Sequence, residues 1–134
     1  MKTLIAIGGG SFQKQETMSI DTYAISRCGK TQPHVLFIPL ASRDDQGYAK
    51  RFKQYYRSLG CQVEALRLLH TKLSNEEIYK KFRSQDMICL LYTSSMIYAK
   101  NIQDYEFFRY DQCIYLSGLR YPYSLYFVYE YEIQ

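Results

Sequence analysis

The glycine turn near the N-terminus is the first feature of the sequence that could support chemistry. Gly8-Gly9-Gly10-Ser11 follows directly after the apolar run at residues 3–7. A glycine turn at the end of a strand can bind phosphate through its backbone N–H groups. A phosphate loop, however, also needs a second glycine followed by lysine, and a dinucleotide fingerprint needs a third glycine where Gln13 stands. We therefore expect a structural turn at the rim of a ligand crevice, and no cofactor.

The charged turn Arg43-Asp44-Asp45 is the second candidate, because it comes soon after the apolar run His34–Ile38. In an open α/β sheet the ligand crevice lies at the carboxyl ends of the strands, so both turns are expected at that edge. Arg43 and Asp44 are therefore candidates for the rim of a substrate pocket. Alternatively, Asp44 or Asp45 caps the following helix, and we favour capping because it requires no ligand.

Residues that could act as a base or a nucleophile are few. The two histidines are His34, which opens an apolar run, and His70, which follows a strand; such positions usually hold structural or surface histidines. Ser117 and the pair Ser94-Ser95 have suitable positions for a nucleophile. A serine without a histidine base within reach stays unactivated, so the sequence predicts no catalytic residue.

The four cysteines are widely spaced, with no Cys-x-x-Cys pair and no neighbouring histidine. This spacing argues against a zinc site, and we expect no bound metal. Cys89 and Cys113 lie inside apolar runs, which is not where a nucleophile would be presented. We expect buried, reduced thiols at Cys28, Cys61, Cys89 and Cys113.

The hydrophobic pattern predicts the elements that would position these residues. Continuous apolar runs predict strands at residues 3–7, 34–38, 62–66 and 86–92. Helical spacing predicts helices at residues 17–28 and 48–59, and the capping box Ser74-Asn75-Glu76-Glu77 opens a third helix. Strands that alternate with helices through short turns indicate an α/β fold, an open parallel sheet with helices on both faces.

The character of the sequence changes near Met87. Five of the 15 tyrosines precede residue 87 and ten follow it. Residues 1–86 hold 14 Lys and Arg against 8 Asp and Glu, whereas residues 87–134 hold 3 against 5. Residues 96–108 fit a helix, residues 112–116 a fifth strand, and residues 123–133 a terminal strand or hairpin arm. We expect a single, incomplete α/β domain over residues 1–134, in which residues 89–134 form a tyrosine-rich tail of different character.

Composition restricts the class of protein. No apolar run approaches the ~18 residues needed to cross a bilayer, and the N-terminal apolar stretch is too short for a signal peptide. We therefore expect a cytoplasmic protein with no membrane partner. The formal charge of +4 comes from basic residues scattered along the predicted helices, without interleaved stacking aromatics, so we expect no nucleic-acid partner.

Four segments of the first two thirds occur together in a known family. They are Ile5-Ala6-Ile7-Gly8-Gly9-Gly10-Ser11, Val35-Leu36-Phe37-Ile38-Pro39 with Ala41-Ser42, Tyr56 to Gly60, and Asp86-Met87-Ile88. In this order and spacing, roughly over residues 1–88, the chain resembles the N-terminal half of the peptidase E family. The resemblance implies a class I glutamine amidotransferase-like, flavodoxin-like three-layer fold. It also implies a serine peptidase that hydrolyses short peptides through an acyl-enzyme.

The same resemblance implies catalytic features that this sequence does not retain. Family members follow the fourth strand with a glycine-rich turn that helps to form an oxyanion hole, but residues 89–95 contain no glycine. They follow the fifth strand with a Gly-x-Ser-Ala-Gly elbow, but Arg120-Tyr121-Pro122 follows Gly118-Leu119 here. Arg120 at the nucleophile position cannot attack a carbonyl, because its guanidinium stays protonated. We also expect the chain to be incomplete, ending before the family's base and its acidic partner.

Two hypotheses follow from these observations. The first is a truncated or degenerate, inactive relative of peptidase E, altered near Met87 either by a reading-frame disturbance or by true divergence. In intact members the partner is a short peptide substrate. The second is a non-catalytic binding or assembly module that uses the tyrosine-rich residues 121–131, since tyrosine is enriched at recognition surfaces. That segment would then join two copies of the chain into a homo-oligomer.

Overall fold

The computed structural model describes residues 2–7, 11–39, 42–92 and 123–129. Its elements are, in order, β1 (Lys2–Ile7), α1 (Met18–Arg27), β2 (His34–Ile38), α2 (Gln46–Ser58), β3 (Gln62–Ala65), α3 (Asn75–Arg83), β4 (Met87–Tyr92) and β5 (Tyr123–Tyr129). All strands and helices predicted before residue 93 are confirmed, and their ends lie within about two residues of the prediction. The predicted helix at 96–108 and strand at 112–116 lie outside the described residues.

Five strands form one sheet in the order β1-β5-β4-β2-β3. β2 pairs in parallel with β3 and with β4, whereas β5 pairs antiparallel with both β1 and β4. β1 to β4 therefore all run in the same direction, as predicted for an open parallel α/β sheet. β5 opposes them because it begins beside the carboxyl end of β4, where Tyr123 pairs with Tyr92, and runs back along it.

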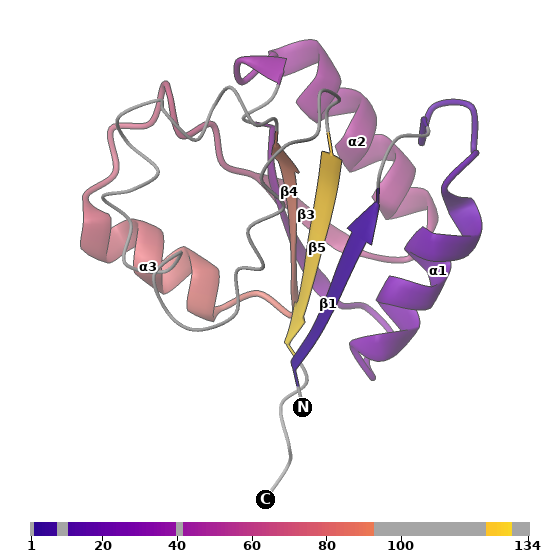
Figure 1. Cartoon of the computed structure of the whole chain (residues 1–134). Helices are drawn as coiled ribbons and strands as arrows, with labels where there is room; N and C mark the ends of the chain where they lie inside the picture. The colour runs from indigo at the N-terminus through magenta and orange to yellow at the C-terminus, as the bar shows by residue number, and fades with distance from the viewer. Residues whose placement is uncertain (1, 8–10, 40–41, 93–122, 130–134) are drawn as a thin grey trace, which may run out of the picture.

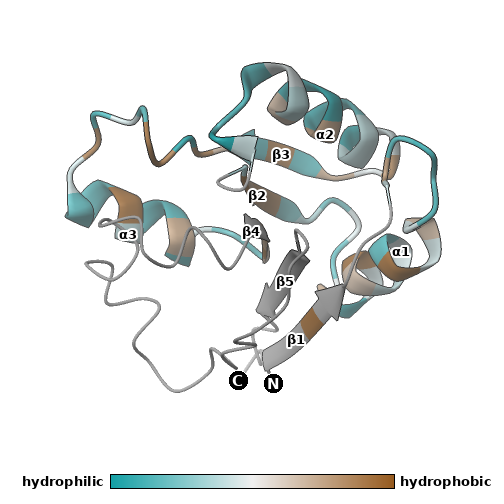
Figure 2. Ribbon diagram, turned by 45° about the horizontal axis from the view of Figure 1, so that its top comes forward, coloured by the Kyte–Doolittle hydropathy of each residue, from teal (hydrophilic) through white to brown (hydrophobic). Residues whose placement is uncertain are grey.

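Helices cover both faces of this sheet, which gives three layers (Figure 1). Of the described helices, α1 and α2 lie on one side of the sheet and α3 lies on the other. No described helix is long and apolar enough to cross a membrane. Figure 2 shows hydrophobic residues on β2 and an alternation of polar and hydrophobic residues on β3, while polar residues predominate on α2. The predicted three-layer architecture is thus confirmed.

Aromatic stacking holds the face covered by α2. Phe37 of β2 stacks on Phe52 of α2 with ring centroids 3.7 Å apart, and Phe52 stacks on Tyr56 at 4.3 Å. These three side chains are at most 2% exposed. Leu36 and Ile38 alternate with Phe37 along the strand, so they point to the α3 side of the sheet. The continuous apolar run of β2 therefore reflects burial on both faces, as expected for an inner parallel strand.

Candidate functional site

The loops that follow β1, β2 and β3 lie at the same edge of the sheet, because these strands run in the same direction. This carboxyl edge is the predicted crevice rim. Gly8, Gly9 and Gly10 lie outside the described residues, as does Arg120, the predicted degenerate elbow position. Ser94, Ser95, Ser117 and Cys113 also lie outside them. The described rim therefore consists of residues 11–17, 42–45 and 66–74.

Ser11 takes part in a local turn immediately after the glycines. Its backbone N–H donates to Glu16 Oε2 at 2.8 Å, and its carbonyl accepts from the Glu16 N–H at 3.0 Å. Its hydroxyl oxygen accepts from the Lys14 N–H at 3.4 Å. All three contacts organise the turn that leads into α1, so Ser11 has a structural role at the rim.

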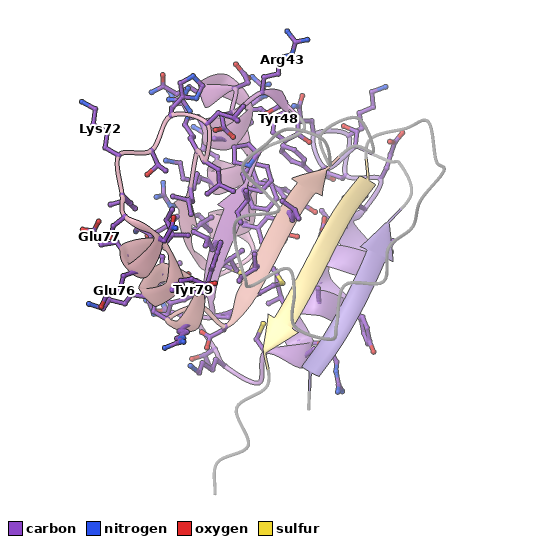
Figure 3. All side chains as sticks on the ribbon, turned by 60° about the vertical axis from the view of Figure 1, so that its left-hand side comes forward. Arg43, Tyr48, Lys72, Glu76, Glu77 and Tyr79 are labelled. Atoms are coloured by element: carbon purple, nitrogen blue, oxygen red, sulfur yellow. The ribbon has the colours of Figure 1, made fainter. Side chains whose placement is uncertain are left out.

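Phe12 anchors this turn on α2. Its ring lies 5.3 Å from that of Tyr48, 5.6 Å from Phe52 and 5.5 Å from Tyr55, measured between centroids. The Arg51 guanidinium lies 5.8 Å from the centroid of Tyr48, within cation–π range. Tyr48 lies at the carboxyl-edge end of α2 (Figure 3), and burial raises the pKa of its hydroxyl, although the nearby Arg51 guanidinium acts in the opposite direction. Tyr48 is thus a neutral hydroxyl at the rim.

The turn after β2 adopts an unusual backbone conformation. Arg43 and Asp44 have φ angles of 55° and 57°, in the left-handed region that non-glycine residues rarely occupy. The turn is closed by the Ser42 hydroxyl, which donates to the Pro39 carbonyl at 2.7 Å, and by the Asp44 N–H, which donates to the same carbonyl at 3.1 Å. This conformation turns the two consecutive side chains in different directions: Arg43 is exposed and points away from the molecule (Figure 3), and Asp44 is buried.

Asp44 and Asp45 have different structural roles, and only one of them caps α2. Asp45 is the N-cap of α2, and its Oδ2 accepts from the Tyr48 N–H at 2.7 Å. Asp44 instead points inward with no exposed surface. The capping interpretation therefore holds for Asp45 and fails for Asp44, because the left-handed backbone turns the Asp44 side chain away from the first turn of the helix.

Asp44 joins the loop after β2 to the loop after β3. Its Oδ2 accepts a short hydrogen bond from the Leu69 N–H and lies 3.6 Å from His70 Nδ1. Its backbone carbonyl accepts from Arg67 Nε at 2.7 Å. The other carboxylate oxygen, Oδ1, is buried and has no hydrogen-bond partner among the described residues. Asp44 therefore links the two loops and places its carboxylate beside the His70 ring.

The two histidines occupy opposite ends of the sheet. His34 begins β2 at the amino edge, where its N–H donates to Asp86 Oδ2 at 2.8 Å. Lys30 Nζ lies 2.6 Å from the other oxygen of Asp86, which ties the amino ends of β2 and β4 together. His70 alone lies at the predicted crevice rim, with about half of its side chain, 53%, exposed.

Among the described residues, no cluster of three or more His, Cys, Asp or Glu side chains has metal-binding geometry. Cys28, Cys61 and Cys89 are buried free thiols, as predicted, and burial raises the pKa of Cys61 to about 11. The sequence indicated Asp44 as a candidate rim residue but did not predict its contact with His70. No local signal predicts it, because the contact joins loops 26 residues apart through a left-handed aspartate.

Comparison with known proteins gives two matches. The family model described as "Peptidase family S51" matches residues 4–91, which include the turns after β1, β2 and β3. The chain is similar to a Bacillus subtilis (strain 168) protein named "Uncharacterized peptidase YgaJ", with 38% identity over 69 residues. That match covers 51% of this chain and 30% of the relative, so the chain spans less than a third of the relative's length. No solved structure matches the chain.

Proposed function

The chain belongs to peptidase family S51, and we propose that it supplies the crevice rim of a serine peptidase fold for short peptides but does not itself turn over substrate. Membership rests on a family match over residues 4–91. The short-peptide substrate and the acyl-enzyme mechanism come from the resemblance to peptidase E. The inactive state is an inference from the residues of this chain.

One observation supports inactivity most strongly. Arg120-Tyr121-Pro122 follows Gly118-Leu119 where the resemblance calls for Ser-Ala-Gly. A nucleophile elbow needs small neighbours because the nucleophile adopts a strained turn between a strand and a helix. Tyrosine and proline do not meet this requirement, and arginine has no nucleophilic lone pair at neutral pH. An acyl-enzyme therefore has no residue on which to form at this position.

The rim is suited to a small charged substrate. Arg43 is exposed at the carboxyl edge, and His70 is half-exposed there beside Asp44. Short peptides carry charged termini, which such side chains can attract. We therefore propose short peptides as the ligand class of the rim. We also propose a cytoplasmic location, which is compatible with the three buried free thiols.

The alternative proposal is assembly of two copies through the tyrosine-rich segment, and the backbone pairing of that segment limits how it could occur. Tyr123–Tyr129, the core of the tyrosine-rich segment, forms β5, whose backbone pairs with β1 on one side and β4 on the other. Neither backbone edge of β5 is therefore open for pairing with a second copy of the chain. Light scattering tests it on the intact chain: a stable dimer supports assembly, and a monomer across the accessible concentration range excludes it.

Hydrolysis of aspartyl dipeptides tests the main proposal. The released amino acids are separated and quantified by chromatography after incubation with the purified chain. We expect no product above the buffer control, because position 120 holds arginine. Product that increases with protein concentration would contradict the proposal, and its persistence in Ser117→Ala would show that the nucleophile lies elsewhere. Reading the coding sequence for residues 86–134 in all three frames distinguishes a frame disturbance from divergence.

A further inference from the structure

The contact between Asp44 and His70 is the structural feature that the proposed function leaves unused. Four interactions form a closed cycle between the two loops. The Asp44 carboxylate accepts from the Leu69 N–H, and the Asp44 carbonyl accepts from Arg67 Nε. The Arg67 carbonyl accepts from the His70 N–H at 3.0 Å, and His70 Nδ1 faces Asp44 Oδ2 at 3.6 Å. His70 is therefore fixed through its backbone N–H, and its ring lies beside the Asp44 carboxylate.

This arrangement determines which ring nitrogen is available for chemistry. A carboxylate beside Nδ1 favours the tautomer that carries its proton on Nδ1, because that N–H can point toward the negative oxygen. Nε2 then keeps its lone pair and can accept a proton. The Asp44 side chain has no exposed surface, while 53% of the His70 side chain is exposed. The partner carboxylate is thus protected from water, and the ring remains accessible.

We propose that His70 is a proton-accepting residue at the crevice rim, positioned by Asp44, and that it gives the chain hydrolytic activity toward small activated acyl esters. Nε2 accepts a proton from a water molecule while the water oxygen bonds to the acyl carbon. The bond from the acyl carbon to the leaving oxygen then breaks, which releases the alkoxide or phenolate and the carboxylic acid. The imidazolium returns its proton to solvent. No serine is acylated, so Arg120 does not block this reaction.

The substrate class follows from the surroundings of His70. Leu69, its neighbour in sequence, is 42% exposed and offers an apolar surface to an acyl or aryl group. A phenolate leaves without protonation, whereas the amine of a peptide bond must be protonated to leave. A single rim histidine that accepts a proton is therefore better matched to activated esters than to peptide bonds. Ester hydrolysis and the absence of peptide turnover are therefore compatible, and each proposal can fail without the other.

The chain contains its own matched control, because His34 is its other histidine and is exposed at the opposite edge of the sheet. The assay follows the release of p-nitrophenolate from p-nitrophenyl acetate by absorbance, with the buffer rate subtracted. His70→Gln should lower the second-order rate constant about tenfold, below the usual ~100-fold for a positioned acid–base group because the ring is half-exposed. His34→Gln should change the rate constant less than about twofold. An unchanged rate in His70→Gln, or equal losses in both variants, would overturn the proposal.

Testing whether Asp44 positions His70 requires a measurement that a loss of packing would not change. Long-range ¹H–¹⁵N spectra of the intact chain report the tautomer of each histidine, and we expect the Nδ1–H form for His70. Asp44→Asn should shift this ring toward the Nε2–H form and lower the esterase rate, with far-UV circular dichroism as the check on folding. A predominant Nε2–H tautomer in the unaltered chain would refute positioning by Asp44 even if Asp44→Asn does not fold.

Discussion

Replacing Tyr56 with phenylalanine should destabilise the chain through a single buried hydrogen bond. Tyr56 of α2 donates its hydroxyl to Asp21 Oδ1 at 2.7 Å, and both residues have no exposed surface. Asp21 also accepts from Tyr55 and from Thr17, each at 2.8 Å. The carboxylate of α1 thus connects α1 to α2, the two helices that cover one face of the sheet.

The expected magnitude follows from the burial of this contact. A hydrogen bond to a charged acceptor contributes about 1.5–3 kcal/mol, and no water can replace the hydroxyl at a fully buried position. Because Asp21 keeps its bonds from Thr17 and Tyr55, we expect a loss of about 2 kcal/mol for Tyr56→Phe. Tyr55 is only partly buried, so water partly compensates there, and Tyr55→Phe should cost less than about 1 kcal/mol.

Urea unfolding followed by far-UV circular dichroism measures both effects. The slope of the free energy of unfolding against urea should stay constant, so that the midpoint alone reports the loss of stability. Tyr23→Phe is a control, because Tyr23 is 55% exposed on α1. The reasoning is refuted if Tyr56→Phe changes the stability by less than about 0.5 kcal/mol, or if Tyr55→Phe costs more than Tyr56→Phe.

Three further predictions concern the capping box of α3 and the Cys61 thiol. Ser74→Ala removes the capping box, in which the Ser74 hydroxyl accepts from the Glu77 N–H and the Glu77 carboxylate accepts from the Ser74 N–H, and should cost about 1 kcal/mol in urea unfolding. The backbone hydrogen bond from Ser74 lowers the pKa of Glu77. The stabilisation that ionised Glu77 gives the folded chain is therefore present above the ordinary glutamate pKa and is lost as the pH falls through the lowered value. Glu77→Gln should make the stability less dependent on acid pH, and an unchanged pH profile of stability would argue against the cap. Burial raises the pKa of the Cys61 thiol to about 11. Iodoacetamide at pH 8 should therefore label Cys61 far more slowly in the native chain than after unfolding. Equal labelling rates, measured by peptide mapping, would contradict the burial of this thiol.

Local patterns predicted the elements of the first 92 residues well, because each has a strong local signal. His34–Ile38 is bracketed by two prolines and buried on both faces, and the predicted bounds match those of β2. The capping box at Ser74 is confirmed with both of its hydrogen bonds. These signals depend on neighbours a few residues apart, which a sequence displays directly.

Features that depend on contacts between distant parts of the chain could not be predicted from local sequence patterns. The strand character of Tyr123–Tyr129 was predicted, but its place between β1 and β4 depends on pairing across more than 30 residues. The inward position of Asp44 depends on a left-handed conformation that nothing in Arg43-Asp44-Asp45 requires. Asp44 lies in the loop after β2 at the carboxyl edge of the sheet, but its contact with His70 could not be inferred from spacing.

The central claim is that this chain has no activated serine, and covalent trapping tests it most directly. A fluorophosphonate reagent bonds to serines that are activated as nucleophiles, and intact-mass spectrometry detects the adduct. We predict no adduct after prolonged incubation of the native chain, because position 120 holds arginine. A stoichiometric adduct mapped to Ser94, Ser95 or Ser117 that is lost on unfolding would contradict the claim.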